Sequence, residues 1–202
     1  YGREEVLANA SIEILPNAIT AFVGPSGSGK STALKLLARF YDPIKGSIEY
    51  ADADLKEIQT DWLRKNVVLV SQSTYLFNDT VLNNLLFVRP NATMEEVREA
   101  CQKASIDEFI NSLPDGYNTE VGLLGDELSA GERQRLGLAR AFLSGADTIL
   151  LDEVTSNVDA INEGIILKSI VQAEGKTFVL FSHRQSTASI ASKTVQFPYQ
   201  ST

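Results

Sequence analysis

Four short runs of apolar residues stand out along the chain, and each predicts a buried parallel strand. They are residues 19–23, 67–70, 148–151 and 177–181. The apolar residues are continuous within each run rather than alternating, as expected of strands that are covered on both faces. Helical patterns lie between the runs, and this alternation of strands and helices predicts an α/β fold with a parallel sheet.

Alternating apolar and polar residues occur early in the chain, at 11–14 and 46–50. Alternation with a period of two indicates strands with one covered face. We therefore predict a small antiparallel β subdomain beside the parallel core.

Residues 72–147 break the strand–helix rhythm with mostly helical signals. A capping box at 93–96 predicts the start of one helix, and residues 106–113 predict a second short helix that ends before the turn at 114–116. We predict a helical subdomain over 72–147, inserted into a core formed by 1–71 and 148–202.

Composition and charge limit the kinds of protein that this chain can be. The 202 residues are 44% hydrophobic and 22% charged, with a net charge of −8, which disfavours a nucleic-acid partner. The single cysteine, Cys101, falls on the apolar side of a predicted helix and is expected to pack in the core. No apolar run reaches the ~18 residues needed to span a bilayer. The chain begins with Tyr1 rather than Met, so we expect a piece of a longer protein; if that protein has a membrane part, it lies outside these residues.

Residues 24–31, Gly-Pro-Ser-Gly-Ser-Gly-Lys-Ser, match the phosphate-binding loop pattern G-x-x-x-x-G-K-[ST] at every fixed position. Glycine permits the close backbone approach that lets successive N–H groups face an anion. Lys30 adds positive charge for the β- and γ-phosphates, and the Ser31 hydroxyl can hold Mg²⁺. The helical run that follows directs its N-terminus at the phosphates. The predicted nucleotide-binding residues here are Gly24, Pro25, Ser26, Gly27, Ser28, Gly29, Lys30, Ser31 and Thr32.

The apolar run at 148–151 ends in two carboxylates, Asp152 and Glu153. Ligands of open α/β sheets bind at the carboxyl ends of the strands. Asp152 is therefore placed to hold Mg²⁺ directly or through water, as a Walker-B aspartate does. Glu153 points differently because it is the next residue, and it could orient and deprotonate an attacking water.

Residues 128–135, Leu-Ser-Ala-Gly-Glu-Arg-Gln-Arg, resemble the Leu-Ser-Gly-Gly-Gln signature of the ATP-binding cassette (ABC) family. Ser129 and Glu132 form a capping box that opens a helix running to about Ser144. The free N-terminus of that helix, the hydroxyl of Ser129 and the glycine at 131 together suit an anion.

The chain is thereby similar to the nucleotide-binding domain of ABC exporters over nearly its whole length, and further residues match family motifs. Gln72 matches the Q-loop glutamine, which in the family approaches Mg²⁺ and the attacking water and links to the membrane domain. Residues 156–159 match the D-loop, ending in Asp159, and His183 matches the switch histidine that contacts the γ-phosphate. Tyr1 resembles the aromatic residue that stacks on adenine.

Two stretches point to the exporter branch of the family. Residues 119–122 resemble the X-loop that is typical of exporters, and residues 76–81 also look like exporter sequence. The chain departs from the family pattern in the signature, where Ala130 replaces a glycine, and after the Walker-B carboxylates, where Val154 replaces Pro or Ala. Its last residues, 196–202, do not resemble the family's closing strands.

The resemblance implies ATP hydrolysis that powers export, on the cytoplasmic face of a membrane and together with transmembrane domains. Two nucleotide-binding domains would form a head-to-tail dimer in which Ser129 and Gly131 of one copy face the γ-phosphate held by the other, in a homodimer or a heterodimer. Two alternatives remain open: a soluble ABC module that uses the same ATP clamp without transport, and a regulatory domain that binds ATP without turning it over.

Overall fold

The computed structural model describes residue 7 and residues 10–199, which divide into two compact units. The first, here called the sheet unit, contains the described residues up to Leu69, Asp147–Glu153 and those from Gly175 onward. The second, the helical unit, contains Val70–Ala146 and Val154–Glu174. Tyr1, predicted to stack on adenine, lies outside the described residues.

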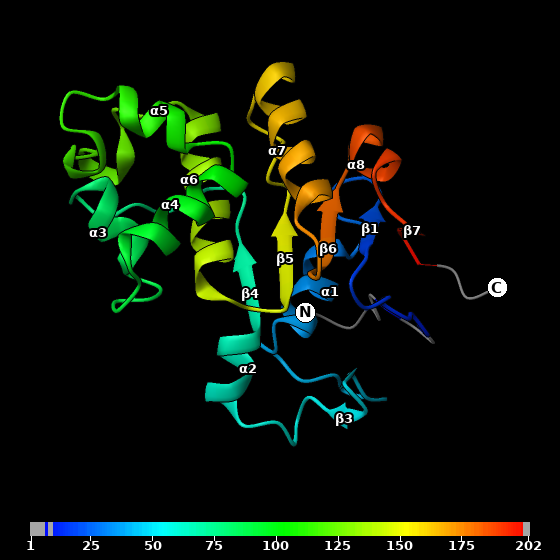
Figure 1. The fold of residues 1–202 in the computed structure, drawn as a ribbon. Helices are drawn as coiled ribbons and strands as arrows, with labels where there is room; N and C mark the ends of the chain where they lie inside the picture. The colour runs from blue at the N-terminus through cyan, green and yellow to red at the C-terminus, as the bar shows by residue number, and fades with distance from the viewer. Residues whose placement is uncertain (1–6, 8–9, 200–202) are drawn as a thin grey trace. The chain divides into compact units, whose positions relative to one another are not determined.

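A five-stranded sheet forms the centre of the sheet unit, in the order β4-β5-β6-β1-β7 (Figure 1). The pairs β5–β6, β6–β1 and β1–β7 are parallel. All four strands predicted from continuous apolar runs are confirmed. The strands are β1 (Ile19–Val23), β4 (Val67–Val70), β5 (Thr148–Asp152), β6 (Thr177–Ser182) and β7 (Lys193–Gln196).

The edge strand β7 was not predicted. Of its four residues only Val195 is buried, because an edge strand in a short parallel pair leaves most side chains at the surface. A search for continuous apolar runs therefore misses it. The strand matters for packing, since it carries the chain to Phe197 beside the core.

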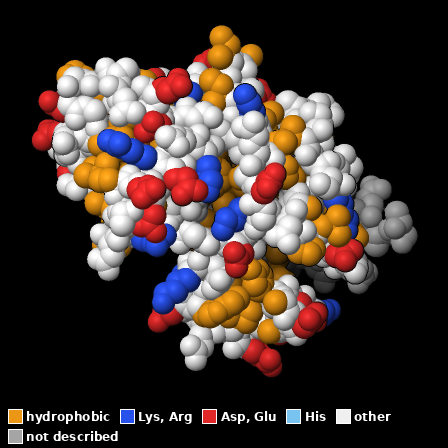
Figure 2. Space-filling view, viewed as in Figure 1, with side chains coloured by type: hydrophobic (Ala, Val, Ile, Leu, Met, Phe, Trp, Pro, Cys, Tyr) orange, Lys and Arg blue, Asp and Glu red, His pale blue; other side chains and the backbone are white. Residues whose placement is uncertain are grey.

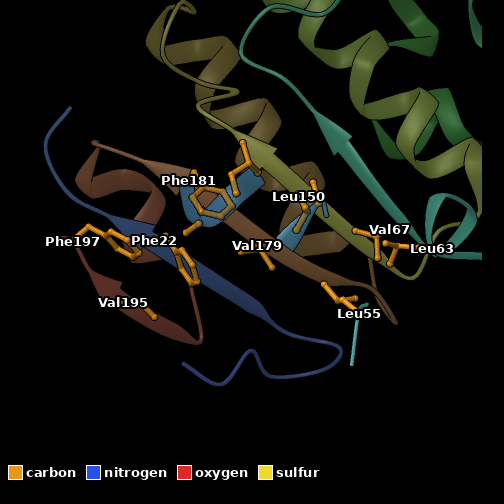
Figure 3. Packing of buried hydrophobic residues seen from close by; sticks show 12 residues of the cluster. Phe22, Leu55, Leu63, Val67, Leu150, Val179, Phe181, Val195 and Phe197 are labelled. Atoms are coloured by element: carbon orange, nitrogen blue, oxygen red, sulfur yellow. The ribbon is translucent and has the colours of Figure 1, made fainter. Parts of the chain in front are cut away.

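Aromatic side chains hold the centre of the sheet unit together (Figure 3). The rings of Phe22 on β1 and Phe181 on β6 meet edge to face with centroids 4.9 Å apart. Phe197 stacks on Phe22 from the other side at 5.4 Å. Such pairs contribute about 0.5–1.5 kcal/mol each beyond the area that they bury. The packing therefore ties neighbouring strands at the ends from which the functional loops emerge.

The small antiparallel sheet is present but shorter than predicted. β2 (Glu49–Tyr50) pairs with β3 (Ala53–Asp54). The strand expected at 11–14 is wrong, because this described segment belongs to no strand. Its backbone carbonyls accept hydrogen bonds from side chains instead: Glu13 O from Lys193 Nζ at 2.7 Å and Ser11 O from the Tyr199 hydroxyl at 3.0 Å.

Three helices belong to the sheet unit: α1 (Lys30–Leu37), α2 (Thr60–Asn66) and α8 (Gln185–Ser189). In Figure 1, α2 and β3 lie toward the beginnings of the strands, away from the strand ends that carry the loops described below. Figure 2 shows hydrophobic side chains at the surface over α2 and β3. Trp62 of α2 is 45% exposed and contacts the ring of Tyr50 edge to face.

The helical unit is built around a long central helix, α6, with α4 packed against it. Both predicted capping boxes are confirmed, Thr93 with Glu96 on α4 and Ser129 with Glu132 on α6. Glycine at 145 ends α6 in the left-handed conformation. The helices are α3 (Val81–Leu86), α4 (Met94–Lys103), α5 (Asp107–Ser112), α6 (Ala130–Ser144) and α7 (Ala160–Gln172), with short 3-10 turns at Gly116–Asn118 and Leu123–Gly125.

No helix in the described part of the chain is both long enough and apolar enough to cross a membrane.

Cys101 is fully buried on α4, as predicted. Burial, as the main cause, raises the pKa of its thiol from the ordinary 9.0 to about 12, although a hydrogen bond with Tyr117 opposes the shift. We expect Cys101 to resist a thiol reagent such as DTNB at pH 8 in the native protein and to react completely in denaturant. Because it is the only cysteine, the colour change reports this site alone.

The same shift makes stability depend on pH. Between pH 9 and about 12 the native thiol keeps its proton while the unfolded thiol loses it, so the free energy of unfolding should fall as pH rises through that window. The variant Cys101→Ala should lose less stability over this window. An equal pH dependence in the two proteins would contradict the assignment.

Candidate functional site

The register of the parallel strands brings three chain segments to one edge of the sheet unit. Val23 at the end of β1 lies opposite Ser182 of β6, and Phe181 of β6 lies opposite Asp152 of β5. The loops that leave these strands therefore start at the same level. This edge, at the carboxyl ends of the strands, is where open α/β sheets bind ligands.

The loop that follows β1 has a backbone that requires glycine. Gly27 and Gly29 have φ values of 79° and 100°, in the left-handed region that disfavours other residues. Gly24 has a different constraint, since a Cβ there would lie 2.3 Å from the backbone oxygen of Phe197. Phe197, the residue that follows β7, thus lies directly against the first residue of the loop.

Polar groups of this loop fit an anionic ligand. The Ser28 hydroxyl is buried and has no hydrogen-bond partner among the described residues. Gly29 precedes α1 without a side-chain cap, so the N-terminus of that helix is available to an anion. Lys30 is buried at 6% exposure, and its ammonium donates to the backbone oxygens of Gly24 and Pro25 at 2.7 and 2.8 Å. An ammonium held across the loop and a hydroxyl without a partner among the described residues, in the same loop, are suited to phosphate.

The other predicted loop residues also lie in this segment. Pro25, Ser26 and Ser31 are exposed. Thr32 is in the first turn of α1, where its N–H donates to Gly29 O at 3.0 Å.

Asp152 and Glu153 stand at the end of β5 in different surroundings. Burial is the main cause that raises the pKa of Asp152, and the charge of Glu153 adds to the shift, while Lys30 and Lys35 oppose it. A carboxylate that is costly to bury and close to lysine is a suitable oxygen ligand for a hard divalent cation.

Glu153 has a φ of 47°, a conformation that costs a non-glycine residue about 1–3 kcal/mol. Its N–H donates to Phe181 O at 2.9 Å, which holds the turn in place. The turn brings its carboxylate to 3.5 Å from Nδ1 of His183, the residue that follows β6. His183 is about half exposed, so the pair sits at an accessible edge.

The helical unit carries the remaining predicted residues. Ser129 caps α6, accepting from the Glu132 N–H at 3.3 Å, while Glu132 accepts from the Ser129 N–H at 2.7 Å. Gly131 is needed for packing, since a Cβ there would lie 2.5 Å from the side chain of Asn162 on α7. The segment Ser129–Gly131 therefore lies in close contact with the start of α7.

Asp159 caps α7. Its carboxylate accepts from the N–H groups of Ile161 and Asn162 at 2.9 and 3.0 Å, and from Asn162 Nδ2 at 2.6 Å. The backbone and side-chain hydrogen bonds from Asn162 are the main causes that lower the pKa of Asp159. Asn162 thus lies between Asp159 and Gly131 and joins the two segments.

Gln72 follows β4 and donates from Nε2 to the Ser156 hydroxyl at 3.0 Å. The backbone oxygen of Gln72 accepts from the side chain of Gln134 on α6. Sequence reasoning missed Gln134, Asn162 and Ser156 as contacts of the predicted residues. The one available signal was that Gln134 lies three residues beyond Gly131 on the same helix face.

Within the sheet unit, the structure gathers the predicted residues of the loop 24–32 with Asp152, Glu153 and His183 at the ends of neighbouring strands. Within the helical unit, it joins Ser129, Gly131 and Asp159 through α6, α7 and Asn162, and it places Gln72 against α6 and Ser156.

Comparisons with known proteins agree on one family. The family model described as "ABC transporter" matches residues 7–156. A "Probable ABC transporter ATP-binding/permease protein" of Haemophilus influenzae is 50% identical over 196 residues, which is 96% of this chain and 36% of the relative. The mouse protein "ATP-binding cassette sub-family B member 6" is 43% identical over 91% of this chain and 22% of its own length.

A solved structure has the same fold. A bacterial Atm1-family ABC exporter with ATP bound matches with a TM-score of 0.89 and 38% identity, over 96% of this chain and 34% of the exporter chain. The chain spans only about a third, or less, of the length of the relatives that it matches. By the family match and the shared fold, this chain belongs to the ABC transporter family and is the ATP-binding domain of an exporter-type member.

Proposed function

We propose that the chain binds ATP with Mg²⁺ and hydrolyses it, and that hydrolysis powers export across a membrane. The observation that carries the proposal is the shared edge of β1, β5 and β6, with a phosphate loop, two carboxylates and a histidine at consecutive strand ends. A nucleotide bound with Mg²⁺ would use all of these groups, and phosphoryl transfer to water needs mainly positioning and charge stabilisation.

The phosphates would be held by the loop 24–32. Backbone N–H groups at the start of α1, the buried Ser28 hydroxyl and the Lys30 ammonium would supply the hydrogen bonds and positive charge. Tyr1 is proposed to stack on adenine.

The oxygen groups of Ser31, Asp152 and Gln72 are the kind that Mg²⁺ prefers. When bound, Mg²⁺ would supply positive charge to the phosphates. Asp152 is already half-buried with a raised pKa, so a cation would offset the burial cost of its charge. Gln72 belongs to the other unit, and its place in the metal site rests on the family resemblance.

Glu153 would take a proton from the attacking water, and His183 would contact the γ-phosphate. The 3.5 Å approach between Glu153 Oε1 and His183 Nδ1 supports these two roles, because both side chains would have to lie near the γ-phosphate. A base that acts in this way typically contributes 10²–10⁴-fold to the rate.

The variant Glu153→Gln tests hydrolysis directly. We expect ATP affinity to stay within about threefold and the hydrolysis rate to fall by about 10²-fold or more, because the amide cannot accept the proton. Phosphate release and ATP binding, measured on the same protein, separate the two effects. The exposed Glu57 of the sheet unit offers a control, since Glu57→Gln should leave both unchanged. Near-normal turnover in Glu153→Gln would remove Glu153 from the proposed role.

Two copies would form a head-to-tail dimer around ATP, as a homodimer or with a related partner. Ser129, Gly131 and the N-terminus of α6 would face the γ-phosphate held by the other copy, with Asp159 of the D-loop near the same interface. The geometry supports this use of α6, because the Ser129 hydroxyl and the glycine at 131 sit at the start of a fifteen-residue helix.

Gel filtration of a Glu153→Gln background, with and without Mg·ATP, tests the dimer. We expect an ATP-dependent shift from monomer to dimer, and an added Ser129→Ala should raise the protein concentration needed for dimerisation about tenfold, because a hydrogen bond to charged phosphate is lost.

Thr93→Ala is the matched control. It removes the corresponding cap from α4 and costs a similar ~1 kcal/mol of stability, yet Thr93 lies outside the proposed interface. Equal weakening of the dimer by both substitutions would mean that Ser129 acts only as a helix cap.

The transmembrane domains are the second proposed partner, which places this domain at the cytoplasmic face of a membrane. In the helical unit Tyr75, Phe77 and Phe87 form a chain of contacting rings with centroids 5.2 and 4.6 Å apart, and they are 59%, 38% and 64% exposed. Exposed aromatic side chains that follow the Q-loop suit a protein partner. Residues 72–147 would form the helical subdomain that receives it, and 1–71 with 148–202 the core.

A further inference from the structure

One face of α6 runs along the segment 71–75, which contains Gln72. Three residues of the helix contact it in turn: Gln134, Gly137 and Arg140. They are three positions apart, so they lie on one face of the helix. All of these residues belong to the helical unit.

Gln134 makes the most contacts with this segment. Its Nε2 donates to the backbone oxygen of Gln72 and, at 3.3 Å, to that of Ser71. Its Oε1 accepts from the Thr74 hydroxyl at 2.8 Å. Carbonyl oxygens can only accept, so the Thr74 donor and the two carbonyls together leave one orientation for the amide. The side chain is 6% exposed, and its polar atoms are used within the protein.

The next two positions bring the same segment close to the helix. A Cβ at Gly137 would lie 2.4 Å from the Thr74 hydroxyl, so only glycine allows the segment to approach this far. Arg140 donates to the backbone oxygen of Tyr75 at 2.6 Å and to the side-chain oxygen of Asn84 at 2.6 Å. The backbone from 71 to 75 is thus held by side chains of α6 rather than by a strand or helix of its own.

We propose that Gln134 is the positioning residue for Gln72, because it holds the backbone of the Q-loop against α6, the signature helix. Gln72 and the Ser129–Gly131 segment at the start of α6 then move as one body. Only two residues separate Gly131 from Gln134 on α6, whereas nearly sixty separate Gly131 from Gln72 along the chain. The clamp therefore turns two distant motifs into neighbours on one rigid element. The inference rests on the proposed function only for the consequence in hydrolysis.

Gln134→Met in the full-length protein tests the clamp, because methionine keeps the length and packing of the side chain and removes both donors. Hydrogen exchange of the backbone N–H groups in the segment 71–76 should become about tenfold faster, because the segment loses two of the bonds that hold it to α6 and opens more often. Gln102→Met, at an exposed glutamine of α4, is the control and should change nothing. Unchanged exchange of 71–76 in Gln134→Met would overturn the proposal.

Kinetics test whether the clamp acts through Gln72. The rate of ATP hydrolysis at saturation should fall in Gln134→Met about as far as in Gln72→Ala, with the ATP dissociation constant unchanged. The double variant should be no slower than the slower single variant, because one residue acts through the other. Additive losses would show that Gln134 acts elsewhere and would overturn the positioning role.

Two outcomes separate the clamp from the proposed function. If Gln72→Ala keeps full hydrolysis, the proposed role of Gln72 fails, and the exchange measurement alone decides the clamp. If Gln134→Met does not fold, Thr74→Val takes its place: it keeps the shape of Thr74 and removes only the hydroxyl that orients the Gln134 amide. Exchange at 71–76 should then rise in the same direction by a smaller factor, and no rise would overturn the proposal.

Discussion

The parallel pairing of β1, β6 and β5 is the constraint on which the candidate site depends. Because Val23 pairs opposite Ser182 and Asp152 opposite Phe181, the strands end together and their loops share one edge. Packing of Phe22 against Phe181 fixes the ends of two of these strands, and Phe197 fixes Phe22 from the edge strand. A slip of one residue in this register would exchange the side chains between the two covered faces of the sheet, break their packing and offset the starts of the loops.

Several residues at that shared edge are in energetically unfavourable conformations or surroundings. Glu153 occupies a backbone conformation that glycine would take more easily, and burial raises the pKa of Asp152. The Ser28 hydroxyl is buried without a hydrogen-bond partner in the part of the chain that the structure describes. Each feature destabilises the protein by itself, but a bound cation would offset the burial of the Asp152 charge, and a bound phosphate would give the Ser28 hydroxyl a partner. Strain of this kind is characteristic of functional sites, because packing elsewhere holds the unfavourable groups in place.

In the helical unit the predicted site residues are positioned by one helix, α6. Residues of α6 contact the start of α7 at Gly131 and the segment 71–75 at Gln134, Gly137 and Arg140. The two glycines are therefore explained by close approach of neighbouring segments rather than by flexibility. The signature sequence specifies a packing surface as well as a helix N-terminus.

Much of this could be predicted from the sequence alone. Continuous apolar runs revealed four strands, capping boxes revealed the starts of α4 and α6, and the phosphate-loop and signature motifs indicated the family, because all these signals depend on residues close together in the chain. The tertiary structure alone decided what depends on distant partners. Whether residues 193–196 and 11–14 form strands depends on whether another strand lies beside them, and only 193–196 pair, with β1. The contacts of Gln134 and Asn162 join residues about thirty to sixty positions apart, and no local sequence pattern reveals such contacts.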